Sequence, residues 1–174
     1  MKLSIRKISL GLAGALALAA GSASAGTVSG SLPVSASVAA SCKIASINAI
    51  AFGSYDPANV NATTPLDAQG AVNVSCTKGD AVSVTLDQGA NATAASTCVA
   101  PARQMADGTN RLAYNVYSDT GRTTAWGCDT TNSVAFTSAS ASTPTTLTTY
   151  GRVPAGQDVP AGSYADTITV SVAF

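Results

Sequence analysis

Residues 162–174, GSYADTITVSVAF, alternate between two kinds of side chain. One row is mostly large and apolar: Tyr164, Asp166, Ile168, Val170, Val172 and Phe174. The other row is small or hydroxylated: Ala165, Thr167, Thr169, Ser171 and Ala173. A period of two with one apolar face predicts a half-buried β-strand. This strand reaches Phe174, the last residue of the sequence, so we expect no turn and no returning strand to pair with its free edge.

Similar alternation recurs upstream, separated by turn residues. The row in residues 27–41 contains Val28, Gly30, Leu32, Val34, Ala36 and Val38. Further short strands are expected within residues 48–57, 70–76, 81–87, 111–119 and 146–156, whereas residues 96–110 and 137–146 are expected to be loops. No helical period follows the first 25 residues. About seven short strands with this spacing predict an all-β, antiparallel sandwich.

The first 25 residues have the features of a cleaved signal peptide. Lys2, Arg6 and Lys7 precede a short apolar core, and Ala23 and Ala25 occupy small-residue positions before a cleavage after Ala25. The apolar run is too short to span a membrane, so we expect export without membrane insertion. The expected mature protein starts at Gly26 and has 149 of the 174 residues, enough for one domain.

Charge and composition argue against several functions. Without Lys2, Arg6 and Lys7, six of the nine basic residues remain against nine acidic ones, a net charge of −3. No basic patch is expected for nucleic acid or anionic lipid. Histidine and glutamate are absent, and most aspartates lie beside turn residues. The sequence therefore supports no catalytic residues, no metal site and no cofactor, and we expect a protein that is not an enzyme.

Four cysteines are expected to form two disulfides, because the protein is expected to leave the cytoplasm. Four cysteines allow three pairings, of which we expect the sequential one, Cys42–Cys76 and Cys98–Cys128. Each bridge would close about 30 residues and stabilise the fold by roughly 3–4 kcal/mol.

Trp126 admits two interpretations. A lone Trp in a sandwich is most often a core residue. An exposed Trp126–Gly127 could instead stack on a sugar ring, which would make the protein a secreted carbohydrate-binding sandwich.

Eight segments then resemble a known family: FGSYDP, VNVSCT, VTLDQG, RQM, LAYNVYSD, WG, YGRVPAGQ and AGSYADTITVSVAF. In this order they are similar to the spore coat protein U domain family, and especially to subunits of archaic (Csu-type) chaperone–usher pili. The resemblance implies an incomplete immunoglobulin-like β-sandwich, completed by a donor strand from a neighbouring subunit. It also implies a single disulfide, so the second pair departs from the family pattern.

The resemblance assigns roles to both ends of the chain. Residues 1–25 would be the signal peptide, 26–34 the donor extension, and 35–174 the sandwich domain, whose own first strand we expect at about Val34–Ser41. The donor residues would be Val28, Gly30, Leu32 and Val34. The acceptor groove would include Ile168, Val170, Val172 and Phe174.

The implied partners are other subunits, a periplasmic chaperone and an outer-membrane usher. The subunits would form a head-to-tail homopolymer, in transit through the periplasm and finally on the cell surface, and would support adhesion and biofilm formation. We expect a shaft or minor subunit rather than a tip, because 149 residues leave no room for the receptor domain of a tip adhesin. The alternative within the same family is a spore or cell coat component.

Overall fold

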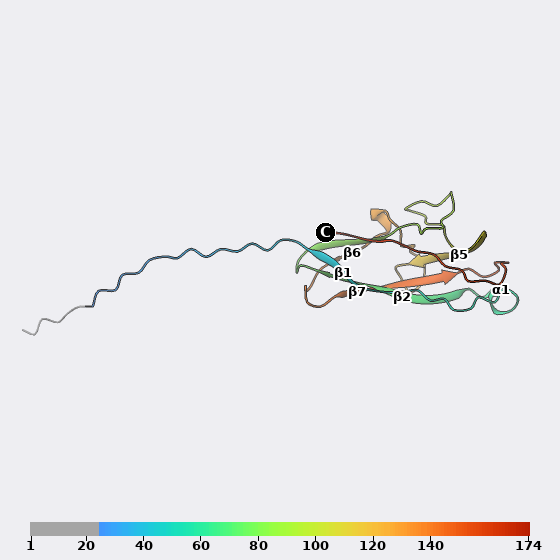
Figure 1. The fold of residues 1–174 in the computed structure, drawn as a ribbon, viewed down its shortest axis with the longest axis horizontal. Helices are drawn as coiled ribbons and strands as arrows, with labels where there is room; N and C mark the ends of the chain where they lie inside the picture. Colours follow the sequence, from blue (N-terminus) through green and yellow to red (C-terminus); the bar gives the residue numbers. More distant parts are fainter. Residues whose placement is uncertain (1–24) are drawn as a thin grey trace, which may run out of the picture. The chain divides into compact units, whose positions relative to one another are not determined.

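The computed structural model describes residues 25–174. The expected signal peptide lies almost wholly in residues 1–24, outside the described residues. The chain divides into two units, Met1–Ala36 and Ser37–Phe174. In the first unit, residues 25–36 form neither helix nor strand (Figure 1). All of these residues are exposed.

The second unit contains two antiparallel sheets in two layers (Figure 1). The five-stranded sheet has the order β1-β2-β7-β5-β4, and the three-stranded sheet has the order β6-β3-β8. The strands are β1 (Cys42–Asn48), β2 (Leu66–Cys76), β3 (Ala81–Leu86), β4 (Arg103–Asp107), β5 (Asn110–Tyr117), β6 (Val134–Thr137), β7 (Thr145–Val153) and β8 (Val170–Ala173). One α-helical turn, α1 (Val60–Thr63), and one 3₁₀ turn, η1 (Thr130–Asn132), lie in connections. The predicted all-β antiparallel sandwich is confirmed.

The core forms where the two sheets face each other. Along β3 and β5, alternate residues are buried, as the period of two predicts. The buried apolar residues come from β2, β3, β5 and β7 and include Val72, Val74, Val82, Val84, Leu86, Leu112, Tyr114, Val116 and Val153.

Trp126 belongs to this core. Its side chain is 0% exposed, and its indole N–H donates to the Val84 carbonyl at 2.9 Å. A ring without exposed surface cannot stack on a sugar, so the carbohydrate-binding interpretation that depends on Trp126 is wrong.

We expect Trp126→Ala to destabilise the domain by about 3–5 kcal/mol, because truncation of a buried aromatic leaves a cavity. The loss is measurable as a lower urea midpoint. Val99→Ala, at an exposed position, serves as the control and should change the midpoint little. A Trp126→Ala midpoint equal to that of the control would contradict the assignment of Trp126 to the core.

Two disulfides, Cys42–Cys76 and Cys98–Cys128, are present in the structure. Cys42 and Cys76 are directly opposite each other on β1 and β2, with Cα atoms 4.1 Å apart. The second bridge joins the loop before β4 to the segment after Trp126, with Cα atoms 4.5 Å apart. The sequential pairing therefore agrees with the structure.

The expected first strand of the sandwich, Val34–Ser41, is wrong. The first strand of the structure begins at Cys42, and all residues from 25 to 41 are exposed and outside any strand. Only the end of this segment is held: the Thr77 N–H donates to the Ser41 carbonyl at 2.9 Å, and the Thr77 hydroxyl donates to the Ala39 carbonyl at 3.3 Å. The alternation in this region therefore contributes no buried side chain to the chain's own core.

Residues 96–110 were expected to be a loop, but they contain a strand. Residues Arg103–Asp107 form β4, which pairs with β5 through a hairpin. The hairpin turn includes Gly108, whose φ of 57° suits glycine. The buried member of β4 is Arg103, so the strand lacks the apolar alternation by which a strand is recognised.

Candidate functional site

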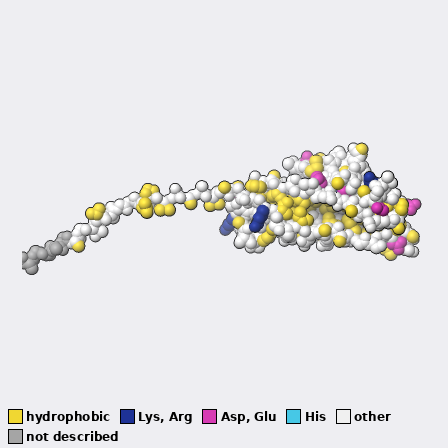
Figure 2. Space-filling view, viewed as in Figure 1, with side chains coloured by type: hydrophobic (Ala, Val, Ile, Leu, Met, Phe, Trp, Pro, Cys, Tyr) yellow, Lys and Arg dark blue, Asp and Glu magenta, His cyan; other side chains and the backbone are white. Residues whose placement is uncertain are grey.

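An apolar groove opens between two unpaired strand edges of the Ser37–Phe174 unit. β1 is an edge strand of the five-stranded sheet, and β8 is an edge strand of the three-stranded sheet. Between them lies a cavity of about 410 Å³, to which both sheets contribute side chains. Figure 2 shows hydrophobic side chains gathered in a band between the two layers of this unit. A second cavity of about 460 Å³ adjoins it and shares Ile50, Phe52, Met105 and Tyr164.

The backbone of the last segment has one occupied edge and one open edge. β8 pairs antiparallel with β3 from Val170 opposite Leu86 to Ala173 opposite Ser83. Upstream of β8, the Thr169 carbonyl accepts from the Asp87 N–H at 3.0 Å, which continues this ladder. In residues 169–173 the odd-numbered residues therefore direct their backbone groups toward β3, whereas Ala165 exchanges both backbone hydrogen bonds with Ala106 of β4. Since successive residues alternate in direction, the even-numbered residues direct theirs toward the open edge.

The sequence placed four residues in the acceptor groove, and the structure brings two of them to the cavity. Ile168 and Val170 line it directly. Val172 is half-buried and packs against the core from β8, but it does not line this cavity. Phe174 is 59% exposed, so the row loses contact with the core toward its C-terminal end.

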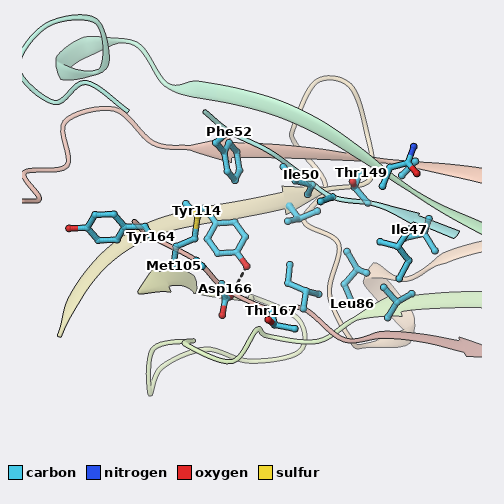
Figure 3. Close-up of a pocket in the computed structure, with 18 residues that line it drawn as sticks. Ile47, Ile50, Phe52, Leu86, Met105, Tyr114, Thr149, Tyr164, Asp166 and Thr167 are labelled. Atoms are coloured by element: carbon cyan, nitrogen blue, oxygen red, sulfur yellow. Dashed lines mark hydrogen bonds between the residues drawn. The ribbon is translucent and has the colours of Figure 1, made fainter. Parts of the chain in front are cut away.

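The opposite wall of the groove comes from β1 and the segment after it. Ile47, Ile50 and Phe52 line the cavity together with Thr149 of β7 (Figure 3). The Thr149 hydroxyl is buried and has no hydrogen-bond partner within residues 25–174. None of these residues was expected in the groove from the sequence. A short strand was expected within residues 48–57, but β1 ends at Asn48 and residues 49–57 form no strand, so Ile50 and Phe52 line the groove from a segment without regular structure.

A hydrogen-bonded carboxylate lies in the otherwise apolar row. Asp166 Oδ2 accepts from the Tyr114 hydroxyl at 2.6 Å (Figure 3). Its Oδ1 accepts from the Asn91 backbone N–H at 3.1 Å and from the Asn91 side-chain amide at 2.9 Å. Burial, followed by the bond to Asp166, raises the pKa of the Tyr114 hydroxyl, so it stays protonated as a donor. Both Tyr114 and Asp166 line the cavity.

Arg103 supports the same end of the groove from the interior. Its side chain is 1% exposed and donates to the carbonyls of Leu86 at 3.2 Å and Trp126 at 2.9 Å. Burial lowers the pKa of the guanidinium, and Tyr114, Asp87 and Asp166 act in the opposite direction. Nη1 has no hydrogen-bond partner among the described residues. Arg103 is thereby bonded to Leu86, the last residue of β3, where the ladder to β8 begins.

The four residues expected to form the donor lie in the Met1–Ala36 unit and are exposed. The exposed fractions are 98% for Val28, 86% for Leu32 and 88% for Val34. Gly30 has no atom within 4 Å of the position that a Cβ would occupy. Alternate positions of this extended segment therefore present exposed apolar side chains.

These features suit the binding of an extended peptide. An unpaired edge offers backbone hydrogen bonds, and the groove beside it offers sites for alternate side chains. Among residues 25–174, no group of three or more possible metal ligands exists. Within the same residues, no helix has the length and apolarity needed to cross a membrane.

Comparisons with known proteins agree with this fold. The model of the Spore Coat Protein U domain matches residues 28–171. Protein U of Myxococcus xanthus is 36% identical over 159 residues, which cover 87% of this chain and 88% of that protein. The fold is also similar to a chain in the crystal structure of the CsuC–CsuE chaperone–tip adhesion subunit pre-assembly complex from archaic chaperone–usher Csu pili of Acinetobacter baumannii. That match has a TM-score of 0.50 and 20% identity, and it covers 79% of this chain but only 40% of the other. On the family match and the relative together, this chain belongs to the Spore Coat Protein U domain family.

Proposed function

We propose that this chain is a structural subunit of an archaic chaperone–usher pilus, exported to the cell surface, where it supports adhesion and biofilm formation. The subunits would polymerise by donor-strand exchange, in which the N-terminal extension of one subunit fills the groove of the next. The proposed role is structural and involves no catalysis and no cofactor.

The observation that carries the proposal is the open edge of β8 beside an apolar groove. A groove of this kind exposes apolar side chains and unpaired backbone groups, which is a hazard for aggregation unless another strand covers it. Val28, Leu32 and Val34 supply exposed apolar side chains at alternate positions. Because donor and acceptor are different surfaces of the chain, their contact is head-to-tail and generates a filament.

Burial of side chains and backbone hydrogen bonds would drive such a contact against the entropy cost of ordering the extension. Each fully buried side chain of this size stabilises the complex by roughly 1.5–3 kcal/mol. Each backbone hydrogen bond along the strand adds about 0.5–1.5 kcal/mol net. Ordering the extension costs about 1–2 kcal/mol per residue. The contact is therefore most favourable for a donor that fills the groove along its whole length.

A periplasmic chaperone and an outer-membrane usher complete the proposal. A subunit with an open groove needs a temporary occupant before polymerisation. The solved complex of similar fold contains a chaperone, CsuC, with a tip adhesion subunit, and this supports a chaperone as the first partner of the present chain. The usher would act where the chaperone strand is replaced by a subunit strand.

The family also supports a second candidate, a coat component. The matching domain takes its description from a spore coat protein. The same head-to-tail contact could then join subunits within a layer.

Electron microscopy of cells with and without the gene tests both candidates. We expect thin surface fibres that bind antibody against this chain and disappear with the gene. A continuous labelled layer would support the coat candidate. An unchanged and unlabelled cell surface would contradict both.

A further inference from the structure

The exposed apolar row extends beyond the donor segment expected from the sequence. Val38 is 85% exposed, and it continues the alternation of Val28, Leu32 and Val34. The next residues are held to the domain, since the Ala39 and Ser41 carbonyls accept from Thr77. The segment available to a neighbour therefore ends at Val38, and its apolar row has six positions.

The open edge of the groove also has six positions. They are the even-numbered residues of 164–174, because odd-numbered residues of this segment bond to Ala106 of β4, to Ala90 and Asp87 after β3, and to β3 itself. The six are Tyr164, Asp166, Ile168, Val170, Val172 and Phe174, of which the first four line the cavity. Five of the six are apolar or aromatic, and the sixth is Asp166. The two rows are therefore equal in length, and only the row of the edge contains a charged residue.

We propose, on the basis of the function proposed above, that residues 28–38 of a second copy dock antiparallel to this edge in one register, set by Asp166. In this register Ala36 lies opposite Asp166. The six pairs are Val28 with Phe174, Gly30 with Val172, Leu32 with Val170, Val34 with Ile168, Ala36 with Asp166 and Val38 with Tyr164.

Asp166 disfavours the neighbouring registers. Its carboxylate is held in place by Tyr114 and Asn91, so it cannot turn out of the groove without breaking these bonds. A large apolar side chain directly opposite would remove water from a charge without offering a hydrogen bond, which is costly. A shift of two residues places Val34 or Val38 opposite Asp166 and leaves one member of the donor row outside the groove. Only the proposed register pairs all six donor positions with the six edge positions and places the small Ala36 beside the charge.

Pro33 favours the antiparallel direction. In an antiparallel pair the residues opposite the open-edge groups exchange both hydrogen bonds, so the even-numbered donor residues bond to the edge and Pro33 points away. In a parallel pair, each edge residue bonds instead to the two donor residues that flank the one opposite it. These would be the odd-numbered donor residues, so the missing N–H of Pro33 would leave one edge carbonyl unpaired. In the antiparallel arrangement, the missing N–H of Pro33 therefore leaves no carbonyl of the edge unpaired.

Cysteine cross-linking of assembled fibres tests the register. Leu32→Cys is combined in one full-length chain with Val170→Cys, or with Ile168→Cys or Val172→Cys as controls. Directly opposite residues have Cα atoms about 5.5 Å apart, within the range of a disulfide, whereas diagonal neighbours are about 7–8 Å apart and beyond it. After mild oxidation, we expect the monomer band of the Val170→Cys fibres to be lost from a denaturing gel and to return with reductant.

Cross-linking of Leu32→Cys to Ile168→Cys would indicate a parallel strand or a register shifted by two residues. Cross-linking to Val172→Cys would indicate a register shifted by two residues in the other direction. Either result would overturn the register while leaving donor-strand exchange intact. Failure of the unmodified chain to form any fibre or layer would instead overturn the proposed function, and this inference with it.

A second set of variants tests the role of Asp166 itself. Ala36→Leu should lower fibre yield by at least ~10-fold, because the new side chain dehydrates the carboxylate. Val34→Leu, opposite Ile168, should keep the yield of the unmodified chain. Asp166→Asn removes the charge but retains an acceptor for Tyr114, so adding it to Ala36→Leu should restore fibres. Equal losses from Val34→Leu and Ala36→Leu, or no recovery with Asp166→Asn, would overturn the role of Asp166.

Discussion

Leu32→Asp should abolish long fibres while periplasmic levels of the subunit stay near normal. The substitution places a carboxylate in the centre of the donor row, where it would have to enter the apolar groove of the next subunit without a partner. The cost is several kcal/mol, enough to prevent polymerisation. Leu32 is 86% exposed in its own chain, so the fold of the mutated subunit should be unaffected. Fibre length by electron microscopy and subunit level by immunoblot measure the two effects separately.

Two matched substitutions locate the effect. Ser31→Asp adds the same charge one residue away, on the opposite face of the donor strand, and should reduce fibre formation far less. Val170→Asp places the charge in the half-buried row of β8, so it should damage folding and remove the subunit from the periplasm. Normal fibres from Leu32→Asp, or equal damage from Ser31→Asp, would show that this face of the extension does not dock.

Local alternation was sufficient to predict most strands and the row that borders the groove. Ile168 and Val170 both pack against the core, as the alternation indicates, but of the strand expected within residues 162–174 only Val170–Ala173 is a strand in the structure. The strand expected at Val34–Ser41 was wrong, although it was expected from the same kind of apolar alternation. Its apolar row is real, yet the side chains of Val34 and Val38 are exposed. Alternation predicts that a row will be buried, but it does not say in which molecule.

Other parts of the groove depend on contacts that are distant in sequence. Tyr114 and Asp166 are 52 positions apart, and neither residue type alone indicates that a buried phenol will hold the carboxylate. The wall formed by Ile47 and Ile50 likewise faces Ile168 only because β1 and β8 end as edges of different sheets. Asp166 could still have been noticed, since a charge within an apolar row needs a partner. The strand Arg103–Asp107 could not, because its inward residue is a buried arginine that bonds to backbone carbonyls.

Moving the donor strand to the other end of the chain should convert a polymerising subunit into a heat-resistant monomer. The variant begins at Ala39 and carries residues 27–38 after Phe174, joined by about four flexible residues, the length of an ordinary hairpin loop. An antiparallel donor starts beside Phe174, so a short loop suffices, whereas a parallel donor would need a connection of a dozen residues or more. Filling the groove within one chain removes both the exposed edge and the free donor.

We expect this variant to elute as a monomer, with a Tm on the order of 10–20 °C above that of a variant that begins at Ala39 and carries no donor. Leu32→Asp within the moved strand should cancel most of the gain, because the charged side chain cannot occupy the apolar groove. The comparison depends on the groove alone, since the sheets are the same in all three variants. If the chain without any donor is already monomeric and equally resistant to heat, the edge of β8 needs no partner, and its alternation reflects only the packing of its inner face on the core.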